Sequence, residues 1–312
     1  MSFSMSVKNE AAKVSVREGY LVDAELCGLI STCGSISIAQ GRLVVSLSTE
    51  NAPVARRIFT HLKSFYSDDV NASARKNVKL KRNIYTISLS DDAAIRKLLN
   101  FCYGEGDFSI YNEISPDLSD SKSKQAFVRG CFLGAGSVTN PRRGYHFEVV
   151  FSNRDAADIL KNILNEYQIS GNIIERSDKF IFYIKGAEMI SDTLTVIGAN
   201  RSVLEFENVR AMKETRNNVN RMVNCETANL EKIVNSSIEQ VNDIMYIDSM
   251  IGLESLPDSL YELAKLRLVN RNASLKDLGE LLNPKVGKSG VNHRMKKIRN
   301  IADDLRGEYD GD

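Results

Sequence analysis

The sequence has no tryptophan, only three histidines and only five cysteines among its 312 residues. The cysteines are scattered, and no two of them show the C-x-x-C spacing of a zinc or redox site. The histidines, at positions 61, 146 and 293, are equally far apart. We therefore expect no metal ion and no cofactor, and we expect the cysteines to be buried thiols of a reduced compartment.

An excess of charge of either sign is also missing. Lysine and arginine number 41 against 40 aspartates and glutamates, so the formal net charge is +1. This balance excludes a uniformly basic surface for nucleic acid, although it allows charge to be segregated locally. Hydrophobic residues make up 43% and charged residues 26%, which excludes intrinsic disorder. The length indicates two or three domains with cores of their own.

Long apolar runs and a secretion signal are absent as well. No run approaches the roughly 20 apolar residues that span a bilayer. The first ten residues, MSFSMSVKNE, lack the basic and apolar regions of a signal peptide. We expect a soluble cytoplasmic protein that does not bind membranes.

The chain does contain a duplication. The apolar segment LCGLISTCGS at 26–35 is followed by VRGCFLGAGS at 128–137. Gly28 and Gly130 are 102 residues apart, and so are Gly34 and Gly136. Because glycine has no β-carbon, we expect these helices to pack backbone to backbone at the centre of a pseudo-twofold pair.

The segments after each helix also correspond. Alternating residues predict strands, and apolar residues at helical spacing predict helices. The predicted elements are 35–38, 42–48, 52–66, 70–74, 84–89 and 92–102 in the first half, and 145–151, 154–167, 171–175, 180–184 and 187–197 in the second. Each half is therefore interpreted as an αββαββα repeat of an α+β fold.

Five segments follow from this interpretation. Pro116 and four serines between 112 and 124 are typical of a linker. The predicted segments are a first repeat at 1–111, a linker at 112–124, a second repeat at 125–207, connecting helices at 208–250 and an all-α domain at 251–312.

The repeat pattern resembles the single-chain LAGLIDADG homing endonucleases. In that family an acidic residue just before the final glycine of each central helix holds the metals that cut DNA. Those positions are Cys33 and Ala135 here, and the earlier acidic positions are Ser31 and Leu133. A thiol and a methyl group cannot supply the hard oxygen ligands of a two-metal site. Glu25 precedes these positions and has no counterpart in the second repeat, so we predict a nuclease-like scaffold without catalytic residues.

The tail begins with the long helical segment 208–245. Within it, the hydrogen-bonding side chains of 219–230 favour a turn between two helices over a binding site. Three shorter helices are predicted after residue 256: one from Pro257 to about Val269, one opened by the capping-box-like Ser274 and ended at Pro284, and one with Ser289 as its N-cap.

The third of these helices has two different faces. At about 100° per residue, Val291, Met295, Ile298, Ala302 and Leu305 share one narrow arc. Six basic residues and no acidic one lie between Lys285 and Arg299. A short helix, a turn and a helix with a basic face are typical of a helix-turn-helix that reads the major groove. The predicted DNA-binding residues are Lys285, Lys288, Ser289, Asn292, His293, Arg294, Lys296, Lys297 and Arg299.

Two other features of the sequence are weaker indications of function. Five basic residues at 75, 76, 79, 81 and 82 fit either a nucleic-acid contact or a solvated hairpin. The stretches Gly104-Glu105-Gly106 and Gly134-Ala135-Gly136 lack the lysine of a P-loop and the strand-turn-helix setting of a dinucleotide site.

A degenerate nuclease-like repeat pair followed by a helix-turn-helix resembles the bacterial WhiA family. The stretches GYHFEV at 144–149, LEFENVR at 204–210, VNRMVNCETANL at 219–230 and KSGVNHR at 288–294 carry the same resemblance, as does the opening FS at 3–4 with VKNE at 7–10. It implies a nucleoid-associated regulator that binds double-stranded DNA, without nuclease activity. Such regulators are connected with sporulation in some bacteria and with cell division and chromosome segregation in others, and other regulatory proteins are further expected partners.

Two alternative functions stay open from the sequence. One is a structural DNA-binding protein of the nucleoid or the division apparatus. The other is a scaffold whose repeat domain senses a ligand or partner, with DNA binding as its output. The sequence leaves the oligomeric state undetermined.

Overall fold

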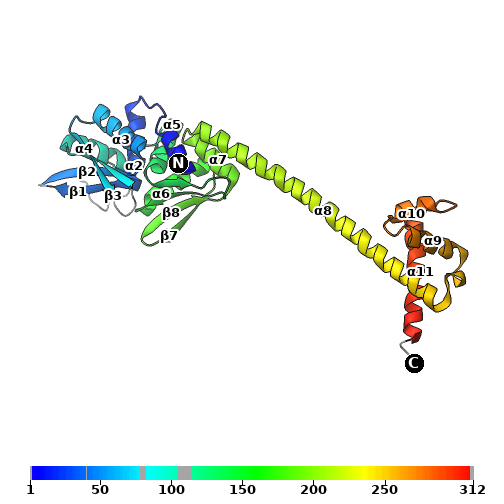
Figure 1. Cartoon of the computed structure of the whole chain (residues 1–312). Helices are drawn as coiled ribbons and strands as arrows, with labels where there is room; N and C mark the ends of the chain where they lie inside the picture. The colour runs from blue at the N-terminus through cyan, green and yellow to red at the C-terminus, as the bar shows by residue number, and fades with distance from the viewer. Residues whose placement is uncertain (1, 40, 78–81, 105–113, 310–312) are drawn as a thin grey trace. The chain divides into compact units, whose positions relative to one another are not determined.

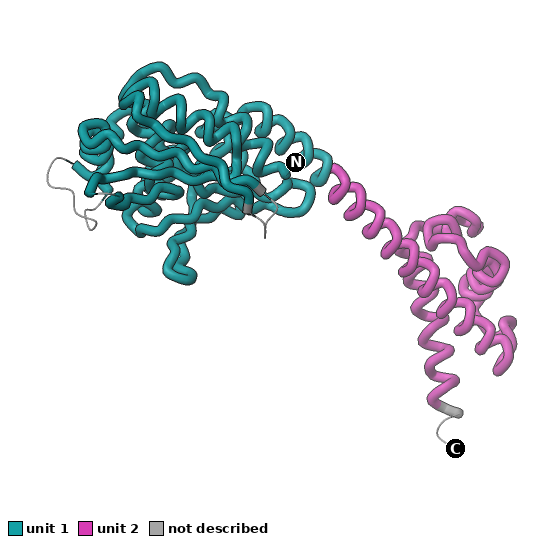
Figure 2. The backbone as a smooth tube through the Cα atoms, turned by 60° about the vertical axis from the view of Figure 1, so that its left-hand side comes forward, with its two compact units in different colours: residues 1–214 teal, residues 215–312 magenta. Residues whose placement is uncertain are grey.

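The computed structural model describes residues 2–39, 41–77, 82–104 and 114–309. The chain divides into two units, residues 1–214 and residues 215–312 (Figure 2). Each unit has its own core of buried apolar side chains. The predicted α+β domain followed by an all-α domain is confirmed.

The first repeat forms a four-stranded antiparallel sheet with helices packed against it (Figure 1). The sheet order is β1-β2-β4-β3, and Ser46 of β2 lies opposite Ser88 of β4. Its elements are α2 (Gly19–Cys33), β1 (Gly34–Ala39), β2 (Arg42–Thr49), α3 (Ala52–Phe65), β3 (Val70–Asn77), β4 (Arg82–Leu89) and α4 (Asp92–Tyr103).

The second repeat has the same element order. Its sheet order, β5-β6-β8-β7, corresponds strand for strand to that of the first. Alternate residues of β6, Phe147, Val149 and Phe151, are buried, as expected for a strand with one face toward helices. Its elements are α5 (Ser121–Ala135), β5 (Gly136–Val138), β6 (Phe147–Phe151), α6 (Arg154–Glu166), β7 (Asn172–Arg176), β8 (Lys179–Ile184) and α7 (Ala187–Val196).

The central helices α2 and α5 approach each other at glycine. A Cβ atom on Gly28 would overlap the carbonyl oxygen of Phe127 and lie 2.8 Å from the nitrogen of Cys131. A Cβ atom on Gly130 would overlap the carbonyl oxygen of Glu25. The predicted backbone-to-backbone contact is confirmed at these two positions.

The second glycine of each pair has a different role. Gly34 and Gly136 follow the helices as the first residues of β1 and β5. A Cβ atom on Gly34 would lie 2.6 Å from the carbonyl oxygen of Ile30, and one on Gly136 would lie 2.7 Å from the Cα of Phe132. Each clash is with the preceding turn of the same chain segment. These glycines allow the abrupt change from helix to strand, and the expectation that they join the two helices is wrong.

A helix before the first repeat was not anticipated from the sequence. This helix, α1 (Phe3–Ala11), starts at Ser2, whose hydroxyl accepts from the backbone of Met5. Phe3, Val7 and Ala11 are buried against the core of the same unit. Their spacing of four residues is the signal by which the sequence could have revealed it.

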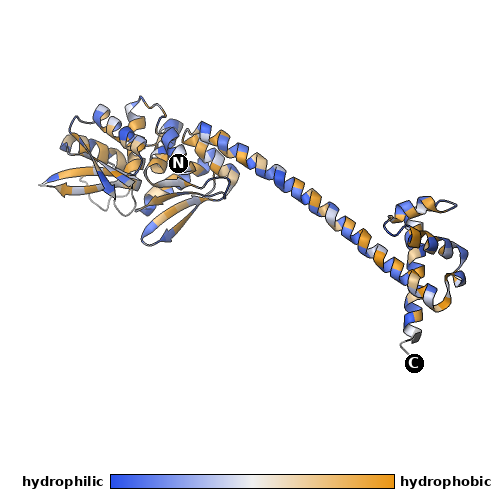
Figure 3. Ribbon diagram, in the orientation of Figure 1, coloured by the Kyte–Doolittle hydropathy of each residue, from blue (hydrophilic) through white to orange (hydrophobic). Residues whose placement is uncertain are grey.

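The tail begins with one uninterrupted helix, α8 (Asn200–Ile251), of 52 residues. The turn predicted at 219–230 is wrong, because this segment lies within α8 and all its side chains are exposed. Its asparagine and threonine side chains therefore leave the helical hydrogen bonds intact. Hydrophilic and hydrophobic residues alternate along α8 (Figure 3). Among the described residues, no helix is long and apolar enough to cross a membrane.

The remaining elements of the second unit are short. They are η1 (Leu253–Ser255), α9 (Asp258–Val269), α10 (Leu275–Leu281) and α11 (Lys288–Tyr309). Their buried apolar residues form one cluster with Ile244 and Ile247 of α8. The end of α8 is therefore part of the core of this unit.

Candidate nucleic-acid interface

The turn between α10 and α11 is fixed by local contacts. Ser274 and Asp277 form a capping box that starts α10. The backbone N–H of Val286 donates to the carbonyl of Gly279 over 3.0 Å, and a Cβ atom on Gly279 would overlap the carbonyl oxygen of Val286. The glycine thus lets the chain turn tightly and start α11 directly beside α10.

The inner face of α11 is the one that the sequence predicted. Val291, Met295, Ile298 and Ala302 are buried in the core of the second unit, and Leu305 packs against it. This packing fixes which side chains α11 turns outward.

Most of the predicted DNA-binding residues lie on the outer face of α11. Lys285 is exposed in the turn just before the helix. The exposed ones on the helix are Lys288, Ser289, Asn292, His293, Lys296, Lys297 and Arg299. Ser289 is the second residue of α11 and not its N-cap, because the first helical bond runs from the N–H of Val291 to the carbonyl of Gly287.

Arg294 and Arg299 face neighbouring helices. The side chain of Arg294 is half-buried, and its Nη1 donates to the carbonyl of Ser259 over 3.5 Å. Arg299 forms an ion pair of 3.2 Å with Glu239 of α8. The acidic partner of Arg299 thus comes from a residue 60 positions earlier in the chain, since the sequence around Arg299 offers none between 285 and 299. Both arginines remain predicted DNA contacts, but each already has a partner within the unit.

The second basic cluster is described only in part. Arg75 and Lys76 are exposed on β3, whereas Lys79 and Lys81 lie outside the described residues. Gly104 ends α4, and the two residues after it in the Gly-Glu-Gly stretch also lie outside the described residues.

A lysine occupies the ends of α2 and α5, where the nuclease resemblance places metal ligands. Lys8 of α1 donates to the carbonyl of Leu133 over 3.1 Å, close to the predicted non-catalytic positions Cys33 and Ala135. Burial lowers the pKa of Lys8 to about 8, against the opposing influence of Cys33 and Glu50. Burial also raises the pKa of Cys33 to about 11, which the charge of Lys8 opposes. Burial thus keeps the thiol of Cys33 neutral, and with Cys33 and Ala135 at these positions neither helix end supplies the carboxylate ligand of a two-metal site.

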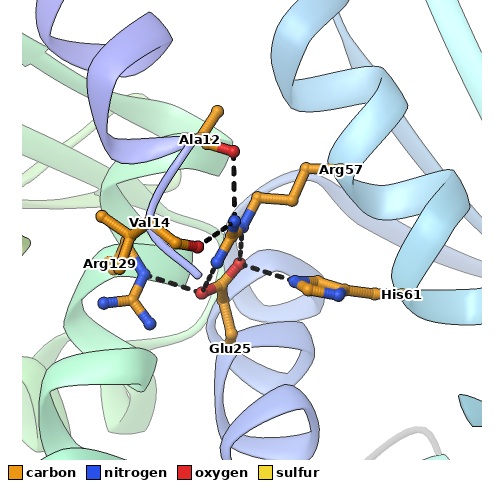
Figure 4. A network of polar contacts seen from close by, with 6 residues as sticks. All are labelled: Ala12, Val14, Glu25, Arg57, His61 and Arg129. Carbon is orange, nitrogen blue, oxygen red and sulfur yellow. Dashed lines mark hydrogen bonds and ion pairs between the residues drawn. The ribbon is translucent and has the colours of Figure 1, made fainter. Parts of the chain in front are cut away.

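Glu25, the acidic residue that the sequence singled out, lies in the middle of α2, where it is fully buried and surrounded by basic side chains (Figure 4). Arg57 of α3 pairs with both carboxylate oxygens, and Arg129 of α5 donates to Oε2 over 2.7 Å. His61 Nε2 lies 3.2 Å from Oε1. Arg57 also donates to the carbonyls of Ala12 and Val14, at 3.1 and 2.6 Å.

This network connects the two repeats electrostatically. Burial alone would raise the pKa of Glu25, but the hydrogen bonds from Arg57 and His61 and the charge of Arg129 outweigh it and hold that pKa well below its usual range. Both carboxylate oxygens of Glu25 are thus occupied by contacts with Arg57, His61 and Arg129. Within the described ranges, no group of three or more His, Cys, Asp or Glu residues is placed to hold a metal ion.

Models of three protein-family domains match the chain. They are the WhiA N-terminal LAGLIDADG-like domain over residues 22–101, the WhiA LAGLIDADG-like domain over 124–216 and the WhiA C-terminal HTH domain over 219–302. The end of the second match, at residue 216, and the start of the third, at residue 219, lie close to the division between the two units.

Whole-length relatives show the same resemblance. The probable cell division protein WhiA of Alkaliphilus metalliredigens is 39% identical over 99% of both chains. That of Clostridium beijerinckii is 42% identical over 98% of this chain and 99% of its own. The crystal structure of full-length DUF199/WhiA from Thermatoga maritima matches with a TM-score of 0.61 and 28% identity, covering 97% of this chain and 98% of that one.

Proposed function

The chain belongs to the WhiA family, and from this premise we propose that it is a DNA-binding regulator without nuclease activity. Its partner is double-stranded DNA, and its site of action is the nucleoid. The name of its relatives, probable cell division protein, supports a role in cell division, and the family resemblance adds chromosome segregation to that role. Control of sporulation genes is the other process that the family resemblance implies.

The outer face of α11 is the observation that carries this proposal. Lysines that can neutralise phosphates and an asparagine that can pair with a base edge are exposed there, while the opposite face is buried. Such a helix can enter the major groove without any loss of core packing. Asn292 lies in the first turn and a half of α11, where recognition helices contact bases.

We expect Asn292→Ala to weaken binding to the preferred DNA site by about 1–3 kcal/mol and binding to random DNA far less. The preferred site is first identified by sequencing DNA that is crosslinked to the protein in cells. Fluorescence anisotropy at one fixed salt concentration then compares the two duplexes. Asn300→Ala is the matched control, since Asn300 is exposed on the same helix but two turns further on. Equal losses on both duplexes, in a folded variant, would remove the base-reading role of Asn292.

We also expect the purified protein to leave DNA intact in the presence of Mg²⁺ or Mn²⁺. The cationic Lys8 and the neutral Cys33 at the ends of α2 and α5 disfavour a two-metal site there. Supercoiled plasmid and linear duplexes are incubated with each metal and resolved on gels. Site-specific cuts that disappear when a nearby acid is replaced would contradict this prediction.

A further inference from the structure

A groove of about 430 Å³ lies in the second unit between α8, α9, α10 and the start of α11. Its polar lining residues come from elements that are far apart in sequence but packed together in the same unit. They include Lys232, Ser236 and Gln240 of α8, Arg267 of α9, Lys276 of α10 and Lys288 of α11. No carboxylate belongs to this described lining. The groove therefore collects four cationic side chains without a balancing acid.

Arg267 gives the groove an unusual floor. This side chain is only 2% exposed, yet among the described residues no acid pairs with it. Its Nη1 donates to the carbonyl of Ala273 over 2.6 Å, and lies 3.4 Å from the carbonyls of Asn270 and Arg271 and from the hydroxyl of Ser237. Its Nε is buried without any partner, and so is Oε1 of Gln240, which lines the same groove. A buried guanidinium without a counter-charge is costly, and a bound anion would offset that cost.

The acidic residues nearest to the lining residues in sequence bind other groups or do not line the groove. Asp277 accepts from the backbone N–H and the hydroxyl of Ser274, at 3.1 and 2.8 Å. Glu239 is paired with Arg299. Neither these two residues nor Glu231 belongs to the lining, although Glu231 is exposed next to Lys232. An anion in the groove would therefore meet ammonium and hydroxyl groups and the amide of Gln240, but no carboxylate of the described lining.

We propose that this groove binds a phosphate of the DNA backbone, so that α8 is part of the DNA-binding surface. The inference rests on the proposed DNA binding of α11. Lys288 connects the two, because it is both the first residue of α11 and a lining residue of the groove. A duplex that contacts the outer face of α11 places phosphates beside the start of that helix. Lys232 then neutralises a phosphate from α8, a helix outside the α10-turn-α11 pair that forms the helix-turn-helix.

The test uses the full chain and compares two lysines of the second unit. Lys232→Ala removes a charge from the groove, whereas Lys265→Ala removes one from the exposed side of α9, where Lys265 lies over the ring of Tyr261. Both side chains are exposed, so both variants are expected to fold, as circular dichroism would verify. Affinity for a labelled duplex is measured by fluorescence anisotropy between 50 and 200 mM salt.

We expect Lys232→Ala, and not Lys265→Ala, to lower the log–log salt slope by roughly 0.9. The affinity loss should then be about threefold larger at 50 mM than at 200 mM salt, on specific and random duplexes alike. Lys232→Arg should restore the slope. Equal slopes for Lys232→Ala and Lys265→Ala would overturn the proposal, while absence of DNA binding by the unmodified protein would overturn the proposed function instead.

A second measurement distinguishes DNA from free phosphate. Inorganic phosphate is titrated into the unmodified protein and into Lys232→Ala by calorimetry at constant ionic strength. Phosphate binding that Lys232→Ala abolishes, together with its lower salt slope on DNA, supports a site for backbone phosphate. If phosphate binding is lost but the DNA salt slope is unchanged, the occupant is a free phosphate compound, and the assignment to DNA is overturned.

Discussion

Glu25→Gln is expected to destabilise the first unit by about 3–5 kcal/mol at neutral pH. The amide would leave Arg57 and Arg129 buried without their shared carboxylate, and both guanidinium groups are less than a tenth exposed. Hydrogen exchange of the amides of α2 and α5, measured by mass spectrometry on the full chain, reports this loss separately from the second unit.

The effect of this substitution should depend on pH. Because the folded pKa of Glu25 is held below its value in the unfolded chain, about 4.3, the carboxylate contributes its full stabilisation above that value. As the pH falls, the unfolded state takes up a proton that the folded state does not, and the stabilisation shrinks. We therefore expect a constant difference between the two proteins from pH 8 to about 5 and a narrowing difference below about pH 4.

Glu18→Gln is the matched control for this experiment. Glu18 is exposed at the start of α2, and its side chain makes no capping hydrogen bond. Its replacement should change stability by no more than about 0.5 kcal/mol. If Glu25→Gln proved as mild as Glu18→Gln, the buried network would not hold the two repeats together.

Gly130→Ala is expected to destabilise the first unit by about 3 kcal/mol or more. The new Cβ atom would overlap the carbonyl oxygen of Glu25 and lie 3.0 Å from its carbonyl carbon. Both atoms belong to the backbone of α2, so no side-chain rotation relieves the clash and the two helices must separate. Thermal unfolding, followed by circular dichroism, measures the shift in midpoint.

Gly144→Ala provides the comparison, because a Cβ atom there would meet no described atom within 4 Å. That variant should unfold at the temperature of the unmodified protein. If Gly130→Ala did so too, α2 and α5 would have room that the structure does not show.

The duplication was predictable from the sequence because both repeats keep the same glycines and the same alternation of strands and helices. The inner face of α11 was predictable because its apolar residues recur at helical spacing. In contrast, the partners of Glu25 lie 32, 36 and 104 residues away, and no local pattern connects them. The position in the second repeat that corresponds to Glu25 is Phe127, so a comparison of the two repeats gives no indication of the network.

The prediction of a turn within α8 was wrong because it rested on side-chain chemistry alone. Asparagine and threonine favour turns when they bond to the backbone, but in 219–230 they lie exposed along a continuous helix. The groove at Arg267 was equally hidden, since its lining residues extend from Lys232 to Lys288 and only the folded chain brings them together.

The pairing of α2 with α5 also determines when the first unit can fold during translation. The buried face of α2 contacts α5, and Glu25 requires Arg129, which the ribosome adds 104 residues later. At about 5–20 residues per second, roughly 5–20 s pass before that partner is made. Until then, a nascent first repeat exposes the apolar face of α2 and leaves Arg57 to neutralise Glu25 alone. We therefore expect the first repeat not to fold by itself, so ribosome-bound chains that stop before α5 should be sensitive to protease and bind chaperones.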